Sequence, residues 1–219
     1  MLMDENNTTL DNKVFGRLED DILNGKYKEG DAVTEQRISN ELGVSRTPVR
    51  EAFHRLEKEG LIKLVPNKGA VVIGVSVDDL VDIYKIRIRL EGLATRMAAE
   101  NITESDREKL IETVELTDFY IRKNDTEKIK NLDSNFHDII YSASGSRMIY
   151  RTLSDLHRSI KRYRKISLTV PNRLPKSIEE HKKILEAILA GDCEAADKLA
   201  SSHVERALVN VMIALGKQL

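Results

Sequence analysis

The second half of this 219-residue sequence contains four residues of the types that bind transition metals: Asp133, His137, His181 and His203. Asp133 and His137 are four positions apart, so a helix would place both side chains on one side. His181 and His203 each stand in an apolar row with helical spacing, and burying imidazoles is costly unless they pair or bind something. Three imidazoles and one carboxylate would suit a divalent ion such as Zn²⁺ or Ni²⁺ and leave coordination positions open.

Amphipathic helices are the elements that must position these residues. The helical pattern runs through six segments: 78–100, 104–123, 126–144, 147–168, 175–190 and 193–216. The last two meet at Gly191 and Asp192, a short turn that would fold them back on each other. His181 lies ten residues before Gly191 and His203 twelve after it, so the hairpin would bring them to similar heights. The alternative is that each histidine is a hydrogen-bonded core or interface residue.

Arg87 is a candidate to bind a ligand beside this metal. It interrupts the apolar row that runs from Leu80 to Ala94, so its guanidinium is expected to face inward. A guanidinium can hold a carboxylate by two parallel hydrogen bonds, which would suit a small organic acid. The alternative is a structural ion pair of Arg87 with a glutamate or with Asp133.

Other polar side chains near these positions are expected to lie outside the site. Arg158, Arg162 and Arg164 could add contacts to an anion, but their position favours a dimer face or a solvated face. His157 favours a structural role. Glu180 is expected to point away from its neighbour His181.

The N-terminal third of the chain has a different pattern. Residues 13–75 contain three helical segments and then two short β-type runs that flank Pro66–Gly69, which is typical of a hairpin. Two of the helices are joined by Leu42–Ser45, where Gly43 would supply the sharp turn of a helix-turn-helix and Ser45 would cap the next helix. The boundary between this domain and the helical segments is expected near residue 76.

The helix after this turn carries a basic row. Arg46, Arg50 and His54 recur every four residues opposite the apolar stripe, with Thr47 beside Arg46. Such a row can face the major groove of DNA, where guanidinium groups bind guanine or phosphate. Lys68 at the hairpin tip could reach a neighbouring phosphate or the minor groove. The alternative is an ordinary solvated helix face.

Composition narrows the class of protein. Lys and Arg number 35 against 36 Asp and Glu, and 41% of the residues are hydrophobic, so we expect a packed core. Cys193 is the single cysteine, which excludes an intramolecular disulfide and a cysteine-based zinc cluster and fits a reducing cytosol. Residues 1–12 are polar and aperiodic, which predicts a flexible arm rather than a signal peptide. No apolar run reaches the roughly 18 residues of a membrane helix, so we expect a soluble, cytoplasmic, mainly α protein.

The N-terminal motifs resemble the GntR family of bacterial transcription factors. The resemblance lies in Gly43–Ala52, Arg55–Glu57 and Glu59–Ile62, within residues 13–74. It implies a winged helix-turn-helix that binds a palindromic operator in double-stranded DNA as a homodimer. The DNA contacts implied at matching positions are Arg37, Ser45, Arg46, Thr47, Arg50, Asn67, Lys68 and Gly69.

The C-terminal motifs are similar to the helical effector domain of the FadR subfamily, the FCD type. They are Arg87–Glu91, Leu132–His137, Glu180–Ile184 and Gly191–Asp192 followed by His203. The metal-binding branch of that family uses one Asp and three His at these motifs, which correspond to Asp133, His137, His181 and His203. The resemblance also implies a small carboxylate effector held by the metal and Arg87.

The prediction is therefore a ligand-responsive transcriptional regulator and not an enzyme. Residues 13–75 would form the DNA-binding domain, and residues 76–219 an antiparallel bundle of about six helices that binds the effector and dimerises. Two alternatives are a direct metal-ion sensor and a metal-dependent hydrolase fused to a DNA-binding domain. The hydrolase is the weaker of the two, because no further general base adjoins the proposed ligands in the sequence.

Overall fold

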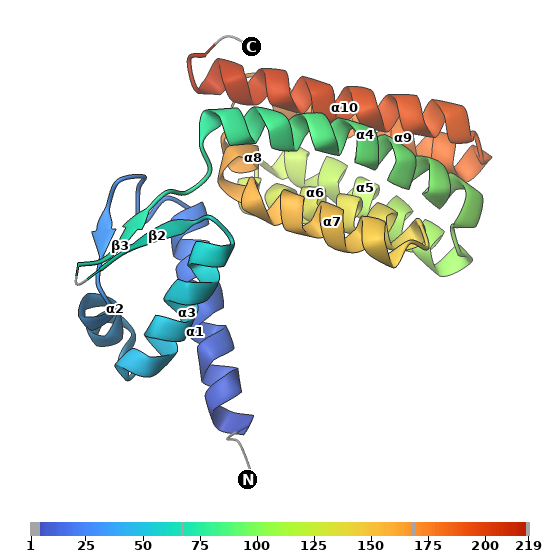
Figure 1. Ribbon diagram of the computed structural model, residues 1–219. Coiled ribbons are helices and arrows are strands. Elements are labelled where there is room, and N and C mark those ends of the chain that lie inside the picture. Colours follow the sequence, from blue (N-terminus) through green and yellow to red (C-terminus); the bar gives the residue numbers. More distant parts are fainter. Residues whose placement is uncertain (1–4, 67, 168–169, 218–219) are drawn as a thin grey trace. The chain divides into compact units, whose positions relative to one another are not determined.

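A computed structural model gives the fold of the chain and describes residues 5–66, 68–167 and 170–217. The chain divides into two compact units, Met1–Val77 and Asp78–Leu219. Helices dominate both units (Figure 1), which confirms the mainly α class with a winged helix-turn-helix and a helical bundle.

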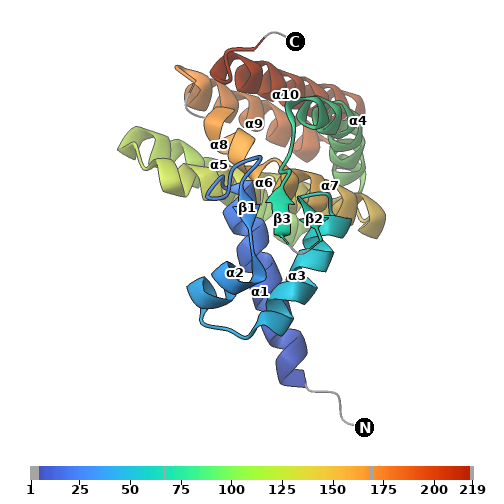
Figure 2. The same ribbon diagram turned by 60° about the vertical axis from the view of Figure 1, so that its left-hand side comes forward.

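Unit 1 combines helices with a small antiparallel sheet (Figure 2). Its elements are α1 (Glu5–Leu23), β1 (Ala32–Val33), α2 (Glu35–Leu42), α3 (Arg46–Lys58), β2 (Ile62–Val65) and β3 (Gly69–Val72). The strand order is β1-β3-β2, so β3 pairs with both neighbours and the β2–β3 hairpin is the predicted wing. Helix α1 packs along α3, and Ile38, Leu56 and Ile62 lie fully buried in the core between the helices and the sheet.

Helix α1 starts earlier than the sequence indicates. It begins at Glu5, inside the segment that we expected to be a flexible arm. Packing explains the difference, because Leu10 contacts the core of unit 1 and the Asn12 side chain accepts a hydrogen bond of 2.8 Å from Arg55. The Arg55 guanidinium also lies over the Phe15 ring, 3.8 Å from its centroid, which ties this turn of α1 to α3.

The helix-turn-helix has the predicted turn. Thr34 caps α2 by accepting a hydrogen bond from the Arg37 backbone N–H, and α2 ends at Gly43. Gly43 has φ 65°, a left-handed conformation that glycine adopts without strain. Ser45 occupies the predicted N-cap position of α3 with an extended backbone, but its side chain makes no capping hydrogen bond.

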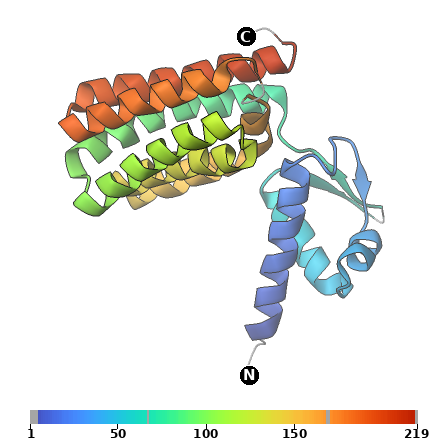
Figure 3. The ribbon, with the colours of Figure 1, turned by 180° about the vertical axis from the view of Figure 1, so that it is seen from behind.

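Unit 2 is a bundle of long helices that run alongside one another (Figures 1 and 3). Its described residues form α4 (Val77–Asn101), α5 (Glu104–Lys123), α6 (Thr126–Ala143), α7 (Arg147–Ser159), α8 (Lys161–Ser167), α9 (Arg173–Ala190) and α10 (Cys193–Ala214). Helix α9 turns into α10 at Gly191, whose φ is 67°, and Asp192 caps α10. This is the hairpin that the sequence predicts.

One predicted helix is two helices in the structure. The segment 147–168 breaks at Ile160, which has φ −103° and ψ 14° and whose side chain is fully buried. The break lets α7 stay against α6 while α8 turns against α10. Among the described residues, no helix combines the length and the apolar character needed to cross a lipid bilayer.

Candidate functional site

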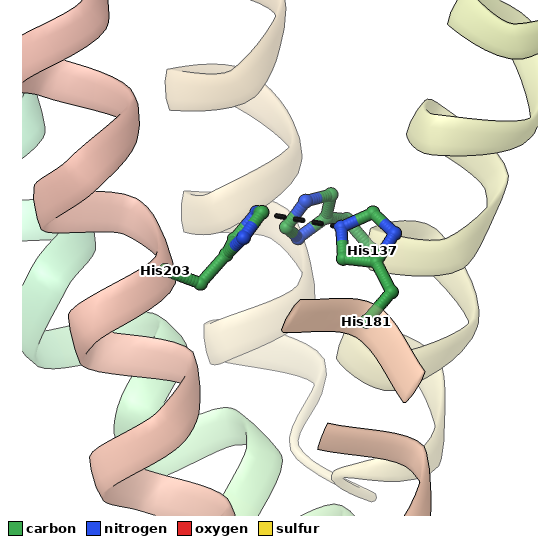
Figure 4. Close-up of side chains that lie close together, drawn as sticks. All are labelled: His137, His181 and His203. Carbon is green, nitrogen blue, oxygen red and sulfur yellow. Dashed lines mark hydrogen bonds between the residues drawn. The ribbon is translucent and has the colours of Figure 1, made fainter. Parts of the chain in front are cut away.

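Three histidines from three helices meet inside the bundle. His137 comes from α6, His181 from α9 and His203 from α10, and all three are buried (Figure 4). One ring nitrogen of each lies within 4.8 Å of the others, and His181 Nε2 is 3.4 Å from His203 Nε2. Metal–nitrogen bonds are about 2.0–2.1 Å long for zinc, so a single divalent ion would fit among these nitrogens.

Two carboxylates orient these rings. Glu91 Oε2 is 2.9 Å from His137 Nδ1, and Glu180 Oε2 is 2.7 Å from His203 Nδ1. A carboxylate that accepts a hydrogen bond from Nδ1 leaves the Nε2 lone pair for a metal and increases its basicity. The donor set therefore fits a metal ion, with its supporting carboxylates in place. Glu180 points toward the site, contrary to the sequence expectation.

Burial favours the neutral form of the His181 and His203 imidazoles. Loss of solvent lowers the pKa of His181 well below its ordinary value, and the neighbouring His203 lowers it further. Burial also lowers the pKa of His203, although the hydrogen bond to Glu180 opposes that effect. Burial alone would raise the pKa of Glu180, but hydrogen bonds and charges from His203 and Arg173 bring it to about 2. Neutral imidazoles beside ionised carboxylates are the protonation states that metal binding needs.

Asp133 lies at the edge of the histidine cluster. Its Oδ1 is 3.8 Å from His181 Nε2, while its Oδ2 forms an ion pair with Arg164 on α8. Burial opposes ionisation of Asp133, but Arg164 and the neighbouring imidazoles outweigh it and hold the pKa of Asp133 below its usual range. Three of the four predicted ligands thus converge, and the fourth is held by an arginine that we expected on a dimer or solvated face.

Arg87 is buried and makes the structural ion pair that was the alternative interpretation. Its Nε donates to Glu91 Oε1 at 2.8 Å, so Glu91 links Arg87 to His137. The Arg87 Nη1 atom is also buried, yet it has no hydrogen-bond partner among the described residues. Arg87 therefore supports the histidine cluster on one side and has a free donor on the other.

A small cavity of about 20 Å³ adjoins the histidines and Arg87. Its lining residues are Tyr84, Arg87, Asp133, His137, Arg164, Ser167, Arg173, Ser177, His203, Val204 and Ala207. Five of these have a buried polar atom without a hydrogen-bond partner in the described structure: Tyr84, Arg87, Ser167, Arg173 and Ser177. Buried polar atoms without partners are costly, and three guanidinium groups around one cavity favour an anion. We name this cavity the metal-side chamber.

The second predicted surface is the exposed face of α3. Arg46 and Arg50 are exposed there, and both are paired with one carboxylate, Glu35 on α2. One nitrogen of each guanidinium, Arg46 Nη2 and Arg50 Nε, lies 3.0 Å from a Glu35 oxygen. The hydrogen bond from Arg50 is the main cause of the lowered pKa of Glu35. Arg37 on α2 is paired in the same way with Glu41, at 3.0 Å.

The wing tip contains one further predicted DNA contact, Lys68, which is exposed. Asn67 lies outside the described residues. Gly69 has a structural reason to be glycine, because its φ is 93° and a Cβ there would lie 2.4 Å from the Val33 carbonyl oxygen. The close approach of β3 to β1 therefore requires a residue without a side chain.

Replacing Gly69 by alanine should destabilise unit 1 by about 3 kcal/mol, because the cost of a left-handed conformation and the cost of a steric clash add up. Gly74→Ala is the matched control: Gly74 has φ 67° but a Cβ there would meet no atom within 4 Å. We expect that control to cost about 1 kcal/mol. Scanning calorimetry of the full-length variants measures both, and an equal loss of stability would contradict the close β1–β3 contact as the cause.

Comparison with known proteins identifies the family. Residues 10–72 match the gntR family of bacterial regulatory proteins, and residues 82–206 match the FCD domain. The chain belongs to the GntR family of regulators that carry an FCD domain. Its relatives are transcriptional regulators and not enzymes, which removes the hydrolase alternative.

Individual relatives cover most of the chain. The HTH-type transcriptional regulator YdhC of Bacillus subtilis is 31% identical over 86% of this chain and 85% of its own length. The HTH-type transcriptional repressor RspR of Escherichia coli is 26% identical over 88% of this chain and 85% of its own. Among solved structures, E. coli McbR/YncC superposes with a TM-score of 0.76, at 26% identity, over 99% of both chains. A GntR regulator from Rhodococcus sp. RHA1 gives a TM-score of 0.72 at 25% identity, over 96% of this chain and 100% of that one.

Proposed function

We propose that this protein binds operator DNA through unit 1 and senses a small organic acid in unit 2, with a divalent metal, Zn²⁺ or Ni²⁺, as part of the sensor. The observation that supports this most strongly is the buried cluster of His137, His181 and His203 beside a cavity rich in guanidinium groups. Guanidinium groups bind a carboxylate by charge and by hydrogen bonds at once. Asp133 would supply a fourth ligand and Arg87 a contact to the acid.

The DNA contacts in this proposal belong to the helix-turn-helix and to the hairpin that follows it. They are Arg37, Ser45, Arg46, Thr47 and Arg50, with Asn67, Lys68 and Gly69 at the wing tip. Exposed guanidinium groups on the second helix of a helix-turn-helix suit base edges in the major groove. A homodimer in the cytoplasm would place two such helices on the two halves of a palindrome.

Selection of binding sites from randomised duplex DNA tests the DNA-binding surface. With the selected duplex, Arg50→Ala should weaken binding about 10- to 100-fold in mobility-shift titrations, since a bidentate base contact contributes about 1–3 kcal/mol. Arg17→Ala is the control, because Arg17 is an equally exposed arginine of unit 1 on α1. Equal losses from both variants would mean that net charge, and not the α3 surface, controls binding.

The sensor part requires that the acid and the operator affect each other's affinity. A ligand that binds two arrangements of the domains equally well does not change the operator affinity, however tightly it binds. Carboxylic acids that bind unit 2 but leave operator affinity unchanged would therefore refute it. Operator binding that responds to a chelator without any acid would instead support the alternative of a direct metal sensor.

A further inference from the structure

Glu57, in the last turn of α3, makes a contact to the wing. Its Oε1 accepts a hydrogen bond of 2.8 Å from the backbone N–H of Leu64 in β2. The helix dipole disfavours a carboxylate near the C-terminus of a helix. Helix stability therefore does not by itself favour a glutamate at this position, whereas the hydrogen bond to the strand does.

Strand β2 lies at an edge of the small sheet and against α3 (Figure 2). The strand order is β1-β3-β2, so within the described part of unit 1 only β3 pairs with β2. Backbone N–H groups along the free edge of a sheet have no strand to donate to. At Leu64 the Glu57 carboxylate takes the place of a neighbouring strand and ties the edge of the wing to α3.

This contact lies close to the tip of the wing. The residue after Leu64, Val65, closes the turn at the tip, because its carbonyl oxygen accepts a hydrogen bond of 3.0 Å from the Lys68 backbone N–H. Leu64, Val65 and Lys68 also line a hollow of about 550 Å³ whose opposite wall includes Arg46 of α3. The place of the exposed Lys68 therefore depends on where the Leu64 amide is held.

The same helix carries the basic row that is proposed to enter the major groove. Glu57 follows Arg50 by seven residues, about two helical turns, so both side chains lie on one side of α3. A hydrogen bond from β2 to Glu57 thus relates the position of the wing tip to that of the basic row. Two binding elements gain affinity when their relative position is fixed before they bind.

We propose that Glu57 is a positioning residue for operator binding, which acts through Leu64 on the wing tip and contacts no DNA itself. This rests on the proposed contact of Lys68 with DNA. The alternative is that Glu57 only satisfies an exposed backbone amide that water would satisfy equally well. Its loss would then leave operator affinity unchanged.

Two substitutions of Glu57 separate its hydrogen bond from its charge. Glu57→Ala and Glu57→Gln both remove the negative charge, but only glutamine keeps a side-chain oxygen that can accept from Leu64. Alanine and glutamine are both good helix formers, so both full-length variants should fold. In mobility-shift titrations with the selected duplex, Glu57→Ala should bind about three- to tenfold more weakly than Glu57→Gln, the equivalent of about one hydrogen bond.

Adding Lys68→Ala to each variant tests whether the effect passes through the wing tip. Together with Glu57→Gln, Lys68→Ala should weaken binding severalfold, as loss of a phosphate contact does. Together with Glu57→Ala it should weaken binding less than about twofold, because residues that act through one contact are not additive. Hydrogen exchange of the Leu64 amide gives a readout without DNA, and it should be at least about tenfold faster in Glu57→Ala than in Glu57→Gln.

The outcomes separate the positioning role from the DNA contact on which it rests. Equal operator affinity of Glu57→Ala and Glu57→Gln, or an equal effect of Lys68→Ala in both, would overturn the positioning role and leave the Lys68 contact intact. If Lys68→Ala alone binds the operator as tightly as the unaltered chain, the proposed wing-tip contact is refuted, and the positioning role with it.

Discussion

Replacing Arg87 by methionine should lower the free energy of unfolding of unit 2 by about 3–5 kcal/mol, the cost of leaving a buried charge without its partner. The Arg87 and Glu91 side chains are each only 3% exposed, and the pair lies at the end of a chain of contacts to His137. Burial alone raises the pKa of Glu91, and Arg87 is the main group that keeps it well below its ordinary value. Urea unfolding followed by circular dichroism measures the loss.

A surface pair on the same helix is the control. Arg96 is 43% exposed and lies 3.7 Å from Glu100 at the same i,i+4 spacing. Arg96→Met should change stability by less than about 0.5 kcal/mol, because exposed ion pairs contribute little. The double variant Arg87→Met, Glu91→Leu should recover part of the loss, since no buried charge is then left unpaired. A loss from Arg87→Met no greater than that from Arg96→Met would disprove the argument.

Replacing His203 by alanine should lower the zinc affinity more than about 100-fold. Loss of a carboxylate that only orients a ligand costs about 10- to 100-fold, and loss of the ligand itself must cost more. Competition with a chromophoric chelator measures the affinity, and mass spectrometry of protein purified without chelator gives the metal content.

Two further variants serve as controls for the loss of zinc affinity. Glu180→Gln removes the charge that orients His203 and should give an intermediate loss of affinity. His54→Ala removes an exposed histidine of α3 and should leave zinc binding unchanged. If His203→Ala retains as much metal as His54→Ala, the three buried histidines are a hydrogen-bonded core and the alternative interpretation holds.

Local patterns predicted the features that depend on neighbours along the chain. Gly43 marks the turn between α2 and α3, and Gly191 marks the hairpin that brings His181 and His203 together. In both cases a glycine between two amphipathic segments is a strong local signal, because glycine readily adopts the positive φ that ends a helix. For Arg87 the sequence left two interpretations open, with the effector contact preferred. The i,i+4 spacing to Glu91, which that prediction did not use, is the local signal for the ion pair.

The sequence alone did not predict the contacts between helices. The break at Ile160 involves neither glycine nor proline, and the apolar periodicity continues through it, so a single helix was the natural prediction. That break sets the direction of α8 and hence the position of Arg164 over Asp133. Glu180 also depends on tertiary structure, because its partners, Arg173 and His203, are seven and 23 residues away.

The shared pairing of Arg46 and Arg50 with Glu35 has a consequence for how binding responds to ionic strength. Proteins that meet DNA with unpaired cations release the counterions condensed on the phosphates, and affinity falls steeply as salt is added. Here two of the cations already have an anionic partner within the protein. In the proposed complex, phosphates or base edges would replace the Glu35 carboxylate as the partner of Arg46 and Arg50. The freed Glu35 would then attract cations from solution. The decline of operator affinity with salt should therefore be shallower than the number of phosphate contacts alone would give.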